Sequence, residues 1–151
     1  FLGEVNLSKD IEYVLSRYFR PTPRVDFSLE AQKYINSAID ISDGLIADLE
    51  HLACASKVRL EVDLEELPIS PSVKALFSED IATEYASSGG DDYELAFTAS
   101  PENLKILKTI GSKLDLKISV IGRVVKGQDV VCFDGQGNLV QSGYEKGYRH
   151  F

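Results

Sequence analysis

Three aspartates and a serine surround one glycine in the stretch IDISDGLIADLEHLA, residues 39–53. Asp40, Ser42 and Asp43 precede Gly44, and apolar residues at helical spacing follow it. Mg²⁺ prefers oxygen ligands such as carboxylates, and the first amides of a helix attract phosphate. A carboxylate, a hydroxyl and free amides at the start of one helix are therefore the groups needed to hold magnesium against a phosphate.

Asp40 is the residue of this stretch without an evident structural role. It is flanked by isoleucine on both sides, so we expect it to end a buried strand. An unpaired carboxylate is costly there, and a cation would relieve the cost. A simpler interpretation stays open, in which Ser42 or Asp43 caps the following helix and Asp40 is a surface residue. Asp48, one turn into the helix, is expected to face solvent, where the helix dipole favours its charge.

A second acid-rich stretch, SSGGDDYELAF at residues 87–97, contains two adjacent glycines. Gly89 and Gly90 permit positive φ and let the backbone approach a ligand closely. Asp91 and Asp92 add two carboxylates immediately before an expected strand. Taken alone, the stretch could be an ordinary turn between a helix and a strand. Two such stretches in one small acidic domain favour a shared site, so we expect them to lie side by side.

The acidic composition limits the classes of partner. The chain of 151 residues has 16 Lys and Arg against 24 Asp and Glu, a formal charge of −8, and no basic run. This charge disfavours nucleic acid and anionic membranes as partners. No signal peptide and no apolar run of membrane-spanning length is present. With only two histidines a zinc site is disfavoured, and anions must be bound locally through backbone amides or cations.

Two further features concern the cell compartment and the extent of the chain. Cys54 and Cys132 are isolated and form no CxxC motif, so we expect reduced thiols, as in cytoplasmic proteins. The chain contains no methionine and begins at Phe1. Because removal of an initiator methionine leaves a small first residue, we expect a piece of a longer protein that holds only part of an active site.

Apolar spacing predicts an α+β fold without internal repeats. Helical periodicity predicts helices over residues 8–19, 29–38, 44–55, 72–86 and 100–114, with Ser28 as the cap of the second. Alternating patterns predict strands over residues 57–64, 93–99 and 116–125, and a hairpin over residues 129–140. Some sequential strands are therefore expected to pair in antiparallel fashion.

The two acid-rich stretches, the strand and LPI loop between them, and the terminal GYRHF resemble, in order and spacing, the C-terminal half of the thiamine-monophosphate kinase family. That family belongs to the superfamily of aminoimidazole ribonucleotide synthetase and selenophosphate synthetase. The resemblance covers residues 28–151 and implies a C-terminal domain with a mixed, largely antiparallel sheet covered by helices. Residues 1–27 then form an inter-domain helix and connector.

The resemblance also implies a role for each matching residue. Asp40 and Asp43 correspond to magnesium ligands, and Ser42 corresponds to a contact with the nucleotide. Asp91 stands at a position, often Glu in relatives, that contacts thiamine phosphate, and the shorter Asp has less reach. Tyr148 corresponds to an aromatic position near the thiamine.

The implied activity is transfer of the ATP γ-phosphate to thiamine monophosphate, a step of thiamine diphosphate biosynthesis in the cytoplasm. Mg²⁺ and the co-substrate ATP are implied, with a homodimer at full length. No dedicated catalytic base is implied, because a phosphate nucleophile is already ionised at neutral pH. The family's N-terminal half carries further metal-binding aspartates, so we expect this chain to be inactive alone. The alternatives are another ATP-dependent synthetase of the superfamily and a non-catalytic interaction domain.

Overall fold

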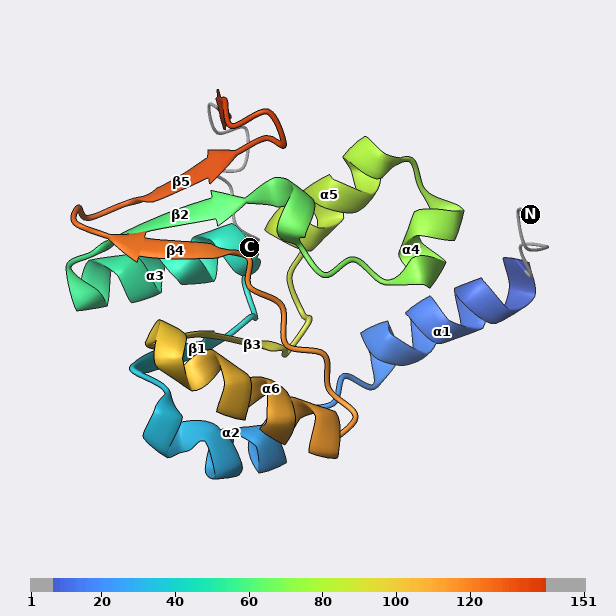
Figure 1. The fold of residues 1–151 in the computed structure, drawn as a ribbon. Coiled ribbons are helices and arrows are strands. Elements are labelled where there is room, and N and C mark those ends of the chain that lie inside the picture. The colour runs from blue at the N-terminus through green and yellow to red at the C-terminus, as the bar shows by residue number, and fades with distance from the viewer. Residues whose placement is uncertain (1–6, 141–151) are drawn as a thin grey trace.

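The computed structural model describes residues 7–140 and shows an α+β domain with two small sheets (Figure 1). Its helices are α1 (Leu7–Phe19), α2 (Val25–Ala31), α3 (Leu45–Ser56), α4 (Pro71–Leu76), α5 (Glu79–Ser88) and α6 (Leu104–Lys113). Its strands are β1 (Ser37–Asp40), β2 (Arg59–Asp63), β3 (Leu95–Thr98), β4 (Gly122–Val125), β5 (Val130–Phe133) and β6 (Leu139–Val140). Three short 3₁₀ helices span Gln32–Tyr34, Leu64–Glu66 and Pro101–Asn103.

The strand pairings confirm the predicted mixed, largely antiparallel arrangement. One sheet has the order β4-β2-β5-β6, in which only the central β2–β5 pair is parallel. The other sheet is the antiparallel pair β1–β3. This second pair joins two segments far apart in the sequence, because β1 follows α2 and β3 follows α5.

A first apolar core lies between α3 and the four-stranded sheet, which α3 covers on one face (Figure 1). The helical repeat of Leu45, Leu49 and Leu52 gives α3 one buried stripe. On β2, the alternation of buried Leu60 and Val62 with polar neighbours supplies the opposite wall.

A second core lies between α2 and α6, on the other side of the β1–β3 pair (Figure 1). Phe27 of α2 and Leu107 of α6 are buried there, and the Phe27 ring is 5.6 Å from the ring of Phe97 on β3. Leu95 and Phe97 face this second core, whereas Ala96 between them belongs to the first. Strand β3 is thus held from both sides, which fixes the loop that precedes it.

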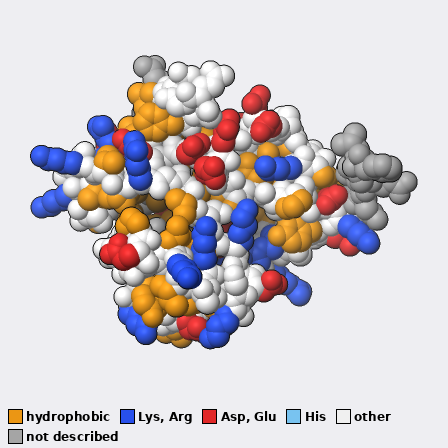
Figure 2. Space-filling view, viewed as in Figure 1, with side chains coloured by type: hydrophobic (Ala, Val, Ile, Leu, Met, Phe, Trp, Pro, Cys, Tyr) orange, Lys and Arg blue, Asp and Glu red, His pale blue; other side chains and the backbone are white. Residues whose placement is uncertain are grey.

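Two local expectations about the N-terminal helices are corrected by the structure. Helix α2 begins at Val25, so Ser28 lies inside it, and the Ser28 hydroxyl donates to the Arg24 carbonyl oxygen rather than capping. Helix α1 packs on α4, but its predicted apolar stripe is largely exposed, including Leu15 and Tyr18. Acidic, basic and apolar side chains are interspersed on the face shown in Figure 2.

Neither cysteine forms a disulfide, as expected. Cys54 is exposed on α3, whereas Cys132 is buried in the first core, where burial, followed by the charge of Glu50, raises the pKa of its thiol to about 11. Within residues 7–140, no helix is both long and apolar enough to cross a membrane.

Candidate functional site

The two acid-rich loops lie side by side, which confirms the central geometric expectation. Strand β1 leads into the first loop and the second loop leads into β3, so the β1–β3 pairing brings them together. The ladder continues beyond the strands: the Ile41 amide donates to the Glu94 oxygen at 2.9 Å and the Tyr93 amide to the Ile41 oxygen at 2.8 Å. Farther out, the Asp91 amide donates to the Ser42 oxygen at 2.9 Å.

Glycines allow this close approach at two points. Gly44 has φ +120° and lies so near the end of α5 that a Cβ there would be 2.7 Å from the Ser88 carbonyl oxygen. A Cβ at Gly90 would be 2.6 Å from the Ser42 carbonyl oxygen. Real Cβ atoms do not approach backbone oxygens so closely, so both loops need glycine at these positions.

Tyr93 lies where the two acid-rich loops meet and contacts one of the candidate residues. Its hydroxyl donates to the Asp91 carboxylate at 3.3 Å. The charge of Asp91 and this hydrogen bond are the largest causes that raise the Tyr93 pKa, and the charges of Asp40 and Asp43 add to the effect. Asp91 and Tyr93 both have positive φ, 64° and 51°, which is uncommon for residues other than glycine. Tyr93 thus contacts Asp91 directly, and the charges of Asp40 and Asp43 on the neighbouring loop also reach it.

Asp40 ends β1 as predicted, but its side chain is exposed rather than buried. The cost of burying an unpaired carboxylate therefore gives no reason for a cation at this residue. In the described part of the chain, no side chain or amide hydrogen-bonds the Asp40 carboxylate, which leaves its oxygens available to a ligand.

The start of α3 does not match the simpler interpretation, in which Ser42 or Asp43 caps the helix. Gly44 is the N-cap residue, and neither Ser42 nor Asp43 makes a side-chain capping hydrogen bond. Instead Asp48, expected to face solvent, is 3 % exposed, and its Oδ2 accepts from the amides of Ser42 at 2.9 Å and Asp43 at 3.1 Å. These two amides are thus bound within the protein, so only the amides farther along the helix start are left for a phosphate.

Two arginines, Arg17 and Arg24, hold the second loop through its residue Glu94. Arg24 contacts the Glu94 carboxylate through two nitrogens, with Nε at 2.7 Å from Oε2. Arg17 at the end of α1 adds a contact of 3.0 Å to Glu94 Oε1. The hydrogen bond to Glu94 is the main cause that raises the Arg24 pKa. The connector between α1 and α2 is therefore tied to the loop that carries Asp91.

Asp92 has the most strongly shifted carboxyl group of this region. Desolvation by surrounding protein atoms, followed by the Glu94 charge and to a smaller extent the Asp91 charge, raises its pKa, and Arg17 opposes them, so that the pKa is about 6. Water still reaches the side chain. We therefore expect a smaller effect on stability than complete burial would produce.

Asp92 is predicted to make folding stability pH-dependent. Between the ordinary value of 3.8 and about 6, the folded protein keeps a proton on Asp92 that the unfolded chain has released. The free energy of unfolding should therefore fall as pH rises through this window, and Asp92→Asn should abolish that part of the loss. Urea unfolding at pH 4 and pH 8 checks this, with Asp115→Asn, which removes an exposed carboxylate elsewhere, as control. Parallel pH profiles for Asp92→Asn and the unchanged chain would rule the effect out.

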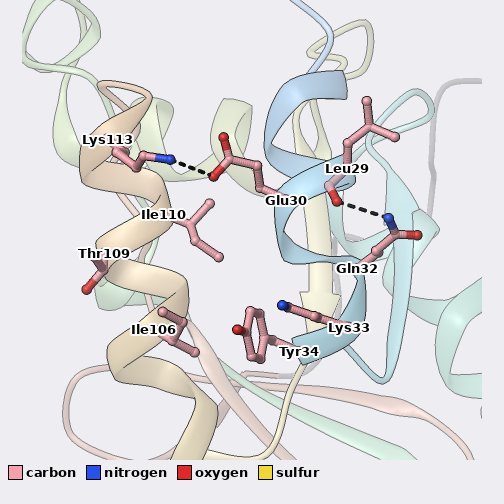
Figure 3. Close-up of a pocket in the computed structure, with 9 residues that line it drawn as sticks. All are labelled: Leu29, Glu30, Gln32, Lys33, Tyr34, Ile106, Thr109, Ile110 and Lys113. Carbon is pink, nitrogen blue, oxygen red and sulfur yellow. Dashed lines mark hydrogen bonds and ion pairs between the residues drawn. The ribbon is translucent and has the colours of Figure 1, made fainter.

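Two other features are considered separately from the two loops. Tyr148 lies outside the described residues, so its predicted position near the thiamine stays a prediction. A shallow groove lies between the α2 region and α6 (Figure 3), with Lys113 and Glu30 paired across it at 3.1 Å. Its lining residues are Leu29, Glu30, Gln32, Lys33, Tyr34, Ile106, Thr109, Ile110 and Lys113. None of them belongs to the two acid-rich loops.

The donor set around Tyr93 fits Mg²⁺ in part. Mg²⁺ is commonly held by one or two carboxylates, water and substrate phosphates rather than by a complete protein cage. Within residues 7–140, no three His, Cys, Asp or Glu side chains are grouped tightly enough to hold a metal alone. The carboxylates of Asp40 and Asp43 could thus supply some ligands and leave the rest to phosphates and other residues.

Comparison with known proteins identifies the domain. The profile of the family described as AIR synthase related protein, C-terminal domain, matches residues 8–135. The chain belongs to this family. Relatives of this AIR synthase related domain are named thiamine-monophosphate kinase, which confirms the resemblance to the C-terminal half of that family.

Three relatives of this AIR synthase related domain show the extent of the match. Thiamine-monophosphate kinase of Escherichia coli K12 is 37% identical over 144 residues, which cover 95% of this chain and 44% of the relative. The crystal structure of the Stenotrophomonas maltophilia K279a kinase has a TM-score of 0.80 at 41% identity, covering 86% of this chain and 43% of that one. A structure of AaThiL complexed with AMPPCP and TMP has a TM-score of 0.73 at 37% identity, covering 94% and 42%. The chain thus spans less than half the length of these relatives.

Sequence reasoning missed three groups of the AIR synthase related domain: Asp48, Tyr93 and the Arg17–Arg24–Glu94 cluster. The signal for Asp48 was present, because it falls on the same helical stripe as buried Leu45, Leu49 and Leu52. Tyr93 was predicted as the first residue of a strand over residues 93–99, but the strand begins only at Leu95 and Tyr93 is exposed. The arginine cluster joins residues 70 or more positions apart, so no local pattern could reveal it.

Proposed function

We propose that this domain is the C-terminal half of a thiamine-monophosphate kinase, which transfers the ATP γ-phosphate to thiamine monophosphate to give thiamine diphosphate. The observation that carries the proposal is the direct hydrogen bonding between the loops that bear Asp43 and Asp91. The relatives' names support the reaction, and the relative complexed with AMPPCP and TMP supports the nucleotide and the thiamine monophosphate.

The residues divide into two roles in this proposal. Asp40 and Asp43 hold Mg²⁺, and Ser42 contacts the nucleotide beside them. Asp91 faces thiamine monophosphate from the opposite loop, with Tyr148 near the thiamine. When bound, Mg²⁺ neutralises phosphate charge that would otherwise keep two anionic substrates apart, an effect all the more needed in a chain of formal charge −8.

Positioning rather than covalent chemistry is the contribution of this half. The phosphate oxygen of thiamine monophosphate attacks the γ-phosphorus in line, and ADP leaves. That oxygen is already ionised at neutral pH, so no side chain of this domain has to act as a general base. The chain's own residues orient the two phosphates, and the paired loops set the distance between them.

The setting of the enzyme is also proposed. Because the chain spans under half of its relatives, the other half supplies further metal ligands and nucleotide contacts, and this chain alone is inactive. A cytoplasmic location agrees with the two free thiols. The homodimer rests on the resemblance to the family.

A substrate panel tests the function. A full-length kinase that carries this chain is incubated with Mg²⁺ and γ-labelled ATP, and with thiamine monophosphate, selenide or a formylglycinamidine ribonucleotide as acceptor. We expect label in thiamine diphosphate alone, and none with this chain by itself. Transfer or ATP cleavage only with one of the other acceptors would assign another synthetase of the superfamily. No reaction and no nucleotide binding under any condition would favour an interaction domain.

A further inference from the structure

Asp48 is a buried acid where the packing pattern calls for an apolar residue. It shares the inward stripe of α3 with Leu45, Leu49 and Leu52, all of which belong to the first core. Its side chain is 3 % exposed and no described Lys or Arg pairs with it. Because a buried carboxylate is costly unless hydrogen bonds compensate it, the groups that Asp48 binds explain its presence.

The hydrogen bonds of Asp48 differ from those of an ordinary helix cap. An acid in a capping box reaches back to the amide of the N-cap residue itself. Asp48 instead reaches past the N-cap Gly44, and one oxygen, Oδ2, accepts from the amides of Asp43 at 3.1 Å and Ser42 at 2.9 Å. It therefore fixes the loop that precedes the helix rather than the first turn.

This contact completes a chain of hydrogen bonds across the site. The amide of Ser42 is held by Asp48, and the carbonyl oxygen of Ser42 accepts from the Asp91 amide at 2.9 Å. Ser42 is thus fixed on one side by the helix and on the other by the second loop. The backbone of Asp43, the next residue, is set by the same carboxylate.

We propose that Asp48 is a positioning residue, whose buried carboxylate orients residues 42–43 so that the Asp43 carboxylate is presented to the metal and phosphates. The inference rests on the proposed function. Groups behind metal ligands set ligand orientation, and their loss commonly weakens metal affinity by about 10–100-fold. Asp48 binds the backbone of the proposed metal ligand Asp43 rather than its side chain. Loss of Asp48 should therefore weaken Mg²⁺ affinity more than it lowers kcat.

Two substitutions separate geometry from charge. Asp48→Ala removes the acceptor and leaves two amides without a partner. Asp48→Asn keeps an oxygen of similar position but removes the charge, and it keeps the test decisive if Asp48→Ala does not fold. Ser70→Ala is the matched control, because Ser70 Oγ accepts from the Val73 amide at 3.2 Å at the start of α4, away from the two loops.

The test uses a full-length kinase that carries this chain, with two measurements. Asp48→Ala should raise the Mg²⁺ concentration at half-maximal phosphoryl transfer by about 10–100-fold, with a smaller change in kcat at saturating Mg²⁺. It should also speed hydrogen exchange at the amides of residues 42 and 43 at least about tenfold. Asp48→Asn should change both in the same direction by a smaller factor, because a neutral amide oxygen is a weaker acceptor than a carboxylate, and Ser70→Ala should change neither.

The outcomes distinguish this inference from the proposed function. If the unchanged enzyme transfers phosphate and Asp48→Ala responds to Mg²⁺ as Ser70→Ala does, the positioning role is overturned and the kinase assignment stands. The same holds if Asp48→Ala does not fold and Asp48→Asn has the Mg²⁺ dependence of Ser70→Ala. If the unchanged enzyme shows neither transfer nor Mg²⁺ dependence, the proposed function fails, and the inference fails with it.

Discussion

Replacing Asp40 or Asp43 by Asn in a full-length kinase that carries this chain should lower turnover by at least about 100-fold. Each change removes one anionic oxygen donor while keeping the size of the side chain. Stability should change by no more than about 0.5 kcal/mol at Asp40, because that side chain is exposed and makes no hydrogen bond in the described part of the chain. Steady-state kinetics over a range of Mg²⁺ concentrations, with urea unfolding alongside, measure both effects.

Asp115→Asn is the matched control for this prediction. It removes the same charge from an exposed turn just after α6, so it reports the effect of net charge alone. We expect Asp115→Asn to retain turnover within about twofold, as is usual for a surface change away from a site. If Asp40→Asn and Asp43→Asn also keep turnover within a few-fold at saturating Mg²⁺, these carboxylates do not hold the metal.

Replacing Gly44 by Ala is expected to give the largest loss of stability of any single methyl addition in the two loops. At φ +120° and ψ 147°, a residue with a Cβ pays a conformational cost of about 1–3 kcal/mol. The new Cβ would also meet the Ser88 carbonyl oxygen at 2.7 Å, a backbone atom that cannot move without shifting α5. Such overpacking adds a further cost of about 1–3 kcal/mol. The free energy of unfolding in urea measures the sum.

Gly137 offers a control that separates these two costs. It also has positive φ, +77°, but a Cβ added there meets no atom within 4 Å. Gly137→Ala should therefore pay a conformational cost without a clash, and a larger loss at Gly44 reports the close approach together with the more restricted backbone conformation there. Equal losses at both positions would mean that the contact between loop 40–44 and the end of α5 contributes nothing.

The fold was predictable because most of its elements are local and periodic. Helix α3 and strand β2 follow directly from the spacing of Leu45, Leu49 and Leu52 and of Leu60 and Val62. Helix starts were predicted less well, since Ser28 resembles a cap in the sequence but lies within α2. A hydroxyl that can cap a helix can equally well donate to a carbonyl one turn earlier, and only the tertiary structure decides.

The location of the site was predictable from the sequence, but the burial, hydrogen bonds and ion pairs of its side chains were not. Two glycine-containing acidic stretches beside predicted strands were enough to predict that the loops meet. Asp40 was expected to be buried because isoleucines flank it, but β1 is short and Asp40 faces solvent at its end. Asp48 was expected to face solvent, but its side chain is buried. Nor could the sequence show that Arg24 and Glu94 pair, since these residues are 70 positions apart in the sequence.

Metal-induced line broadening tests the central claim most directly. In a full-length kinase that carries this chain, a small amount of Mn²⁺ is added in place of Mg²⁺ in the presence of ATP, and amide signals are followed by NMR. The account predicts that signals of residues 40–44 and 89–93 broaden together, while those of Lys33 and Lys113 at the groove stay sharp. Broadening of one loop without the other, in an enzyme that transfers phosphate, would contradict a shared metal–phosphate site.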